Sequence, residues 1–82
     1  MDAEKRAELL QLHIQMRQAA DSLHSQAQEV REMAKRIEDL TKDTTIRYAA
    51  LRVRVEARAA FEQATDLRRE LEEMGEELRG QA

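Results

Sequence analysis

The fold of this chain depends on one short stretch near its middle, residues 40–46, with the sequence LTKDTTI. It interrupts a helical pattern of apolar residues that runs along the rest of the chain. Its threonines lose side-chain freedom in a helix, and Asp43 or Thr44 is suited to cap a helix that follows. It contains no Gly, Asn or Pro to mark a tight turn. Two arrangements therefore remain open: the chain bends back here, or one rod runs straight through.

Before this stretch, apolar residues recur at alternating steps of three and four, which is the spacing of one helix face. The first and fourth positions of this repeat are Leu9, Leu12, Met16, Ala19, Leu23, Gln26, Val30, Met33, Ile37 and Leu40, and only Gln26 is polar. The next position adds His13, Ala20, Ala27 and Ala34. A stripe of this width suits a helix that packs against two neighbours, so we predict a helix over roughly residues 3–40.

After the stretch, a second apolar series continues without a miss. Its members are Ile46, Ala50, Val53, Ala57, Ala60, Ala64, Leu67, Leu71, Met74 and Leu78. They predict a second helix over roughly residues 45–79. The two series differ in phase by one residue, and residues 41–45 must absorb the slip. The arms on either side have similar lengths, which favours a hairpin bend over a local irregularity in a continuous helical rod.

We therefore predict an all-α fold, in which residues 1–82 form a single antiparallel two-helix hairpin that resembles a coiled coil. In a hairpin centred near Asp43, the small Ala50, Ala57, Ala60 and Ala64 come level with Ile37, Val30 and Leu23. We expect these large and small residues to interdigitate in the seam between the helices. The alternatives are a continuous parallel coiled-coil rod and, for residues 51–57, a strand, because apolar and charged residues alternate there.

Composition limits the classes of function. The 82 residues include no Pro, Cys or Trp, one Tyr and one Phe, which is typical of long helices. A net charge of −3 argues against nucleic acid as the main partner. We find no signal-peptide pattern and no apolar run long enough to cross a bilayer, so we expect a soluble, cytoplasmic protein without membrane contact.

The residues that carry chemistry form no convincing constellation. His13 and His24 lie eleven positions apart, about 16 Å along a helix, which is too far to share one metal ion. Both are expected to be solvated or at a bundle edge. No glycine-rich turn exposes a nucleophile, and the glutamates between residues 70 and 77 are expected to face water. We therefore expect no enzyme activity, no cofactor, no metal and no small-molecule substrate.

One arginine stripe stands out on the second helix. It contains Arg47, Arg54, Arg58 and Arg69, with Leu51 and Phe61 among them. It can anchor an acidic partner helix, or it can pair with the first helix, where Arg54 and Arg58 are expected to come level with Glu32 and Glu29.

A short segment of the predicted second helix resembles a known interaction module. Residues 60–68, AFEQATDLR, resemble the Phe-Glu-x-Ala-x-x-Leu-Arg core of the helical-hairpin interaction module in the UvrB and UvrC repair proteins. In that module a loop precedes the Phe-Glu pair, whereas here residues 53–60 continue a helical pattern. The likeness is confined to these few residues, and we assign no family.

A hairpin of two helices buries too little apolar surface to offset the ordering of its residues. We therefore expect a homodimer that forms a four-helix bundle, or a bundle completed by another helical protein. The expected function is protein binding, as a small adaptor, chaperone or regulatory subunit. The residues assigned to protein contact are Leu9, Leu12, Met16, Leu23, Val30 and Ile37 of the first helix, and Leu51, Arg54, Arg58, Phe61, Leu67, Leu71, Met74 and Leu78 of the second.

Two other functions remain as alternatives. The first is a coiled-coil oligomerisation stalk or spacer, which belongs with the rod. The second is a nucleic-acid-binding helical dimer that uses Arg47, Arg54 and Arg58.

Overall fold

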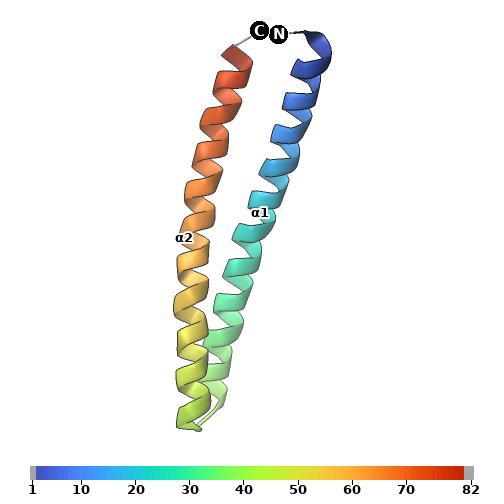
Figure 1. Ribbon diagram of the computed structural model, residues 1–82. Helices are drawn as coiled ribbons and strands as arrows, with labels where there is room; N and C mark the ends of the chain where they lie inside the picture. Colours follow the sequence, from blue (N-terminus) through green and yellow to red (C-terminus); the bar gives the residue numbers. More distant parts are fainter. Residues whose placement is uncertain (1, 81–82) are drawn as a thin grey trace.

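The chain forms two long helices that lie side by side and run in opposite directions (Figure 1). The computed structural model describes residues 2–80, in which α1 spans Ala3–Leu40 and α2 spans Thr44–Gly80. The hairpin measures 62 × 16 × 13 Å. The predicted two-helix hairpin is confirmed, and the continuous rod is wrong because the chain turns back at the predicted stretch. The strand alternative for residues 51–57 is also wrong, because these residues lie within α2.

The bend needs no glycine because side chains bond its backbone groups. Thr41 ends α1 with an extended backbone, at φ −109° and ψ 146°. Its hydroxyl oxygen accepts a hydrogen bond of 3.1 Å from the Asp43 N–H. The Oδ1 of Asp43 in turn accepts a bond of 3.0 Å from the Ile46 N–H, which caps the first turn of α2. No residue between 2 and 80 has a positive φ, so the bend is made without the left-handed backbone that favours glycine.

The outer end of α1 is capped in the same way. The Oδ1 of Asp2 accepts a hydrogen bond of 2.8 Å from the Lys5 N–H. A short polar side chain therefore starts each helix by bonding one of its unpaired amides. Neither α1 nor α2 contains an apolar segment that could span a lipid bilayer.

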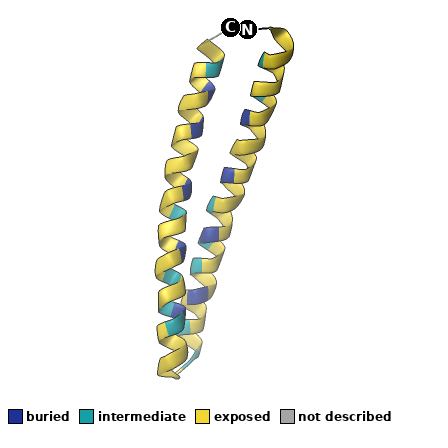
Figure 2. Ribbon diagram, in the orientation of Figure 1, coloured by how far each residue is buried: buried dark blue, intermediate teal, exposed yellow. Residues whose placement is uncertain are grey.

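The contact between the helices is built from small residues. The buried residues lie on the facing sides of the two helices (Figure 2), and all but Gly75 recur every seven positions. We call this line of residues the alanine seam; it comprises His13, Ala20, Ala27 and Ala34 of α1, and Ala50, Ala57, Ala64, Leu71 and Gly75 of α2. Because alanine and glycine have little or no side chain, the two helices can approach closely along the seam.

The seam differs from the prediction, in which large residues of the first helix interdigitated with small residues of the second. Val30 is 39% exposed, whereas Ala34, one turn later, is 3% exposed. In α1 the seam follows one edge of the predicted stripe, the position of His13, Ala20, Ala27 and Ala34, so the helix is rotated and most large residues lie beside the contact. The large stripe residues that are exposed are Leu9, Leu12, Met16, Leu23, Val30, Met33, Ile37, Leu40, Ile46, Val53, Leu67 and Met74. Leu71 is buried, and Leu78 is half-buried.

Polar contacts hold the two helices in register. At the open end, the Nη1 of Arg6 donates to the Leu78 carbonyl at 3.0 Å. Further along, Arg68 Nε lies 2.9 Å from Asp21 Oδ1. Arg54 forms its ion pair with Glu38, whose Oε2 lies 2.8 Å from the Arg54 Nε, and not with Glu32, the acid expected at its level.

Candidate protein-interaction surface

The alanine seam divides the hairpin into two flanks of different chemistry. On one side, every seventh residue of each helix is apolar and none is buried. We call this surface the apolar flank; its two inner rows are Leu9, Met16, Leu23, Val30 and Ile37 of α1, and Ile46, Val53, Ala60, Leu67 and Met74 of α2. Because both rows keep the seven-residue repeat of the seam, they follow it along the length of the hairpin.

Shallow hollows follow one another along this flank. Near the bend, one hollow has an almost wholly apolar lining; it is formed by Val30, Met33, Ala34, Ile37, Ile46, Ala49, Ala50 and Val53. In the middle of the hairpin, another is lined by Leu23, Ala60, Gln63, Ala64 and Leu67. The flank is therefore ridged by large side chains and indented where the alanines lie.

The apolar flank gathers most of the exposed large hydrophobic residues of the described chain. Only Ile14, Tyr48 and Val55 among them lie elsewhere on the helix surfaces. Single exposed apolar residues are ordinary on a protein surface, but a continuous band along two helices is typical of a binding surface. Met33, Ile46 and Val53, which the sequence placed inside the hairpin, are part of this exposed band.

The other flank is more polar, and several of its side chains make contacts between the helices. The Nη2 of Arg54 donates to Glu38 Oε1 at 3.2 Å, in addition to the close contact of its Nε. The ring of Phe61 lies against that of His24, with 4.1 Å between the centroids. We call this surface the polar flank. Its side chains contact each other across the two helices, whereas the large side chains of the apolar flank remain exposed.

The predicted contact residues therefore fall on both flanks. The inner rows of the apolar flank contain Leu9, Met16, Leu23, Val30, Ile37, Leu67 and Met74, and Leu12 lies beside them. The polar flank carries Leu51, Arg54, Arg58 and Phe61, whereas Leu71 belongs to the seam and the half-buried Leu78 lies beyond its end. Ala60 was not among the predicted contacts, although its place in the seven-residue row of Val53 and Leu67 could have identified it.

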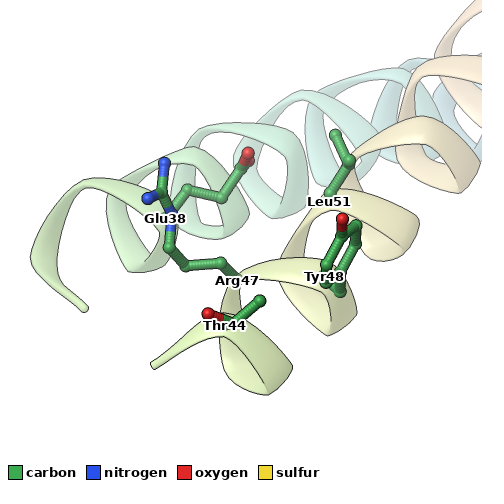
Figure 3. Close-up of a pocket in the computed structure, with 5 residues that line it drawn as sticks. All are labelled: Glu38, Thr44, Arg47, Tyr48 and Leu51. Atoms are coloured by element: carbon green, nitrogen blue, oxygen red, sulfur yellow. The ribbon is translucent and has the colours of Figure 1, made fainter. Parts of the chain in front are cut away.

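Near the bend, the polar flank has a small pocket that contains part of the arginine stripe. Glu38 of α1 and Thr44, Arg47, Tyr48 and Leu51 of α2 line it (Figure 3). Its lining mixes charged, hydroxyl and aromatic groups from the first turns of α2. The predicted contact residue Leu51 is half-buried here.

The other arginines of the stripe lie beside carboxylates. Arg58 Nε lies 3.4 Å from the Oε1 of Glu62, one turn later on the same helix. Arg69 Nη2 lies 2.9 Å from Asp66 Oδ1. With Arg54 paired to Glu38, these contacts reduce the positive potential that a phosphate backbone requires.

His13 is buried, contrary to the expectation of a solvated or edge position. It is 6% exposed, and its Nε2 donates to the Leu71 carbonyl at 2.6 Å. The carbonyl oxygen can only accept, so the Nε2 carries the proton. Gly75 makes room for the ring, since a Cβ there would lie 2.8 Å from the His13 Cε1.

Neither histidine takes part in a group that could hold a metal ion. Over residues 2–80, no three His, Asp or Glu side chains lie close enough together for that role. The glutamates at positions 70, 72, 73, 76 and 77 are all exposed. The geometry therefore directs attention to the apolar flank as the candidate functional site.

No family model matches the chain, and neither a curated protein nor a solved structure is similar enough to count as a match. The segment of α2 that resembles the UvrB and UvrC module also lacks its loop, because α2 runs uninterrupted through residues 53–60.

Proposed function

We propose that this protein is a non-catalytic protein–protein interaction module, a small adaptor, chaperone or regulatory subunit, which binds other helices through its apolar flank. It works by self-association or by completing a helical bundle with a partner protein. One observation carries the proposal. The alanine seam joins α1 to α2 and leaves the large side chains of both helices half-exposed along the apolar flank.

The shape and chemistry of the flank suit a helix as the occupant. The residues of its inner rows recur every seven positions, which is about two helical turns. An apolar helix laid along the flank can therefore place side chains of the same spacing in successive hollows. The hollow near the bend is almost wholly apolar, whereas a small-molecule site needs convergent polar groups to orient its ligand. An extended peptide has no unpaired sheet edge to join, because both elements of the described chain are helices.

The energetic gain on covering the flank is substantial. Full burial of one Val, Leu, Ile or Met side chain stabilises by about 1.5–3 kcal/mol, so covering a half-exposed one contributes on the order of 1 kcal/mol. The exposed side chains include Val30, Ile37 and Val53, which lie near one another around one hollow. Association through this flank therefore removes several large apolar side chains from water at once.

A matched pair of valines tests the proposal. Val53 lies on the apolar flank and is 47% exposed, and Val55 on the same helix lies outside it and is 59% exposed. We expect Val53→Gln to weaken association about fivefold or more, and Val55→Gln to leave it unchanged, because only the first side chain is covered on binding. The measurements are sedimentation equilibrium of the purified chain and capture of partners from extracts of its native host. The proposal is wrong if neither form of association depends on Val53.

A further inference from the structure

Each inner row of the apolar flank has five members, so each row has a middle residue. Leu23 is the middle member of the inner row of α1, and Ala60 is the middle member of the inner row of α2. The two residues lie at the same level of the hairpin, since both line the hollow in the middle of the hairpin and a second hollow next to it on the side of the bend. A single twofold axis at this level, perpendicular to the helices, therefore places each row against itself in reverse.

We propose that the apolar flank is covered by a second copy of this chain, related by that axis, so that the two bends lie at opposite ends of a four-helix bundle. The inference rests on the proposed function, to which it adds the partner and its orientation. In this arrangement α1 packs on α1 and α2 on α2. Leu9 then meets Ile37 of the second copy, Val53 meets Leu67, and the small Ala60 meets Ala60 at the centre.

Charged residues at the border of α1 favour this orientation. A row of exposed residues runs beside the flank on α1, with Glu8 near the open end, Ser22 at the centre and Arg36 near the bend. When two copies of α1 lie antiparallel about Leu23, Glu8 of one copy comes close to Arg36 of the other. The pair forms twice, because a twofold axis repeats every contact.

The border of α2 is complementary in the same orientation. Arg52 is exposed on the bend side of Ala60, and Asp66 and Glu70 are exposed on the other side at a similar distance along the helix. With Ala60 on the axis, Arg52 of one copy comes level with Asp66 and Glu70 of the other. Opposite charges therefore meet on both borders of the interface, and the approach of Glu56 to Asp66 of the other copy is the exception.

The other symmetric arrangement, with both bends at one end, brings like charges together. Its twofold axis is parallel to the helices, so no sliding is possible and residues at equal height face each other across the interface. Val30 and Glu56 line one hollow, so Glu29 then meets Glu56 of the second copy. Arg6 contacts Leu78, so Glu8 then meets Glu77. Like charges at these levels disfavour that dimer.

The size of the flank matches the need of a stable dimer. A face of 62 by 16 Å offers on the order of 1,000 Å² per copy, against about 800 Å² per partner in a standard protein interface. Such an interface is also rich in Leu, Ile, Val and Met at its middle and charged at its rim, as in homodimers.

Spin labels at the bend test the orientation directly. The chain has no cysteine, so Lys42→Cys provides a single labelling site at the bend. We expect light scattering to give twice the chain mass of 9.5 kDa, and pulsed electron paramagnetic resonance to give a distance between labels of about 55–60 Å. Bends at one end would give less than about 25 Å. A short distance, a folded monomer or a larger oligomer overturns the arrangement.

A charge exchange provides a second, independent readout. Glu8→Arg and Arg36→Glu should each raise the dimer dissociation constant about threefold to tenfold, because each places like charges together twice. The double variant restores the opposite charges and should return the constant to its original value. Failure of the double variant to recover overturns the pairing. If Val53→Gln abolishes a dimer whose bends lie close together, the proposed function stands and only this arrangement fails.

Discussion

Gly75 and His13 show how one missing side chain shapes the contact between the helices. Glycine inside a helix is less favourable than alanine by about 1 kcal/mol, so propensity alone argues against Gly75 in α2. The buried imidazole occupies the space beside it, and its Nε2 bonds the Leu71 carbonyl. Elsewhere in the seam an alanine of one helix faces an alanine of the other. At this level the His13 ring instead packs against the backbone of Gly75.

Gly75→Ala should therefore change stability in opposite directions in two backgrounds. With His13 present, the new Cβ displaces the ring, and we expect the free energy of unfolding to fall by about 1 kcal/mol because a buried hydrogen bond is lost. In a His13→Ala background the same substitution should raise it by about 1 kcal/mol, through helix propensity. Urea unfolding at fixed protein concentration measures both changes.

Gly80→Ala serves as the control for that experiment, since no other side chain of the described residues lies within 4 Å of the position its Cβ would take. Gly80→Ala should change the free energy of unfolding by the same small amount with His13 and with Ala at position 13. If Gly75→Ala has the same sign with and without His13, the ring does not determine the need for glycine.

At the scale of the helices, close approach is the feature that the alanine seam provides. Ala27 and Ala57 are both buried and line the same hollow, with larger residues on either side of them. A larger side chain in this line is expected to push the helices apart, because closely packed helices leave room for only a small side chain where they touch.

Ala57→Leu should accordingly lower the free energy of unfolding by about 1–3 kcal/mol, although leucine is more hydrophobic than alanine. Ala7→Leu is the matched control, because Ala7 is exposed on α1, and its effect should stay within about 0.5 kcal/mol. Thermal or urea unfolding followed by circular dichroism measures both. An unchanged or increased stability of Ala57→Leu would show that the helices are not held at close separation.

The two helices and the bend could be predicted from the sequence, because their seven-residue apolar pattern persists over many turns. The seam could not. Val30 and Ala34 lie one turn apart on neighbouring lines of α1, and the same period describes both lines. Hydrophobicity favours Val30 as the buried residue, whereas close packing of two helices favours Ala34. That choice rotates the helix, and it also explains why Arg54 reaches Glu38 and why Phe61 contacts His24 instead of forming an exposed patch.

At the scale of the whole molecule, the hairpin behaves as a stack of equivalent levels. The seam repeats every seven residues on both helices, so removal of one repeat from each arm should keep the remaining residues in phase.

Deletion of residues 24–30 together with 54–60 should therefore leave a folded hairpin that is shorter by about 10 Å. Small-angle X-ray scattering measures the length, and circular dichroism measures the helix content. The control removes five residues from each arm, 24–28 and 56–60, which turns the following residues by about 140° and takes the seam out of line. We expect that variant to lose most of its cooperative unfolding. Equal stability of the two deletions would contradict a periodic seam.

The start of α1 and the end of α2 lie together at one end of the hairpin, where Arg6 contacts Leu78 (Figure 1). A mechanical load applied across these two ends therefore acts on one level at a time. The Arg6 contact breaks first and that of His13 next, and the helices then separate level by level toward the bend. Because no two levels share the load, the hairpin resists tension weakly in this direction, while a pull between the bend and the open end runs along both helices.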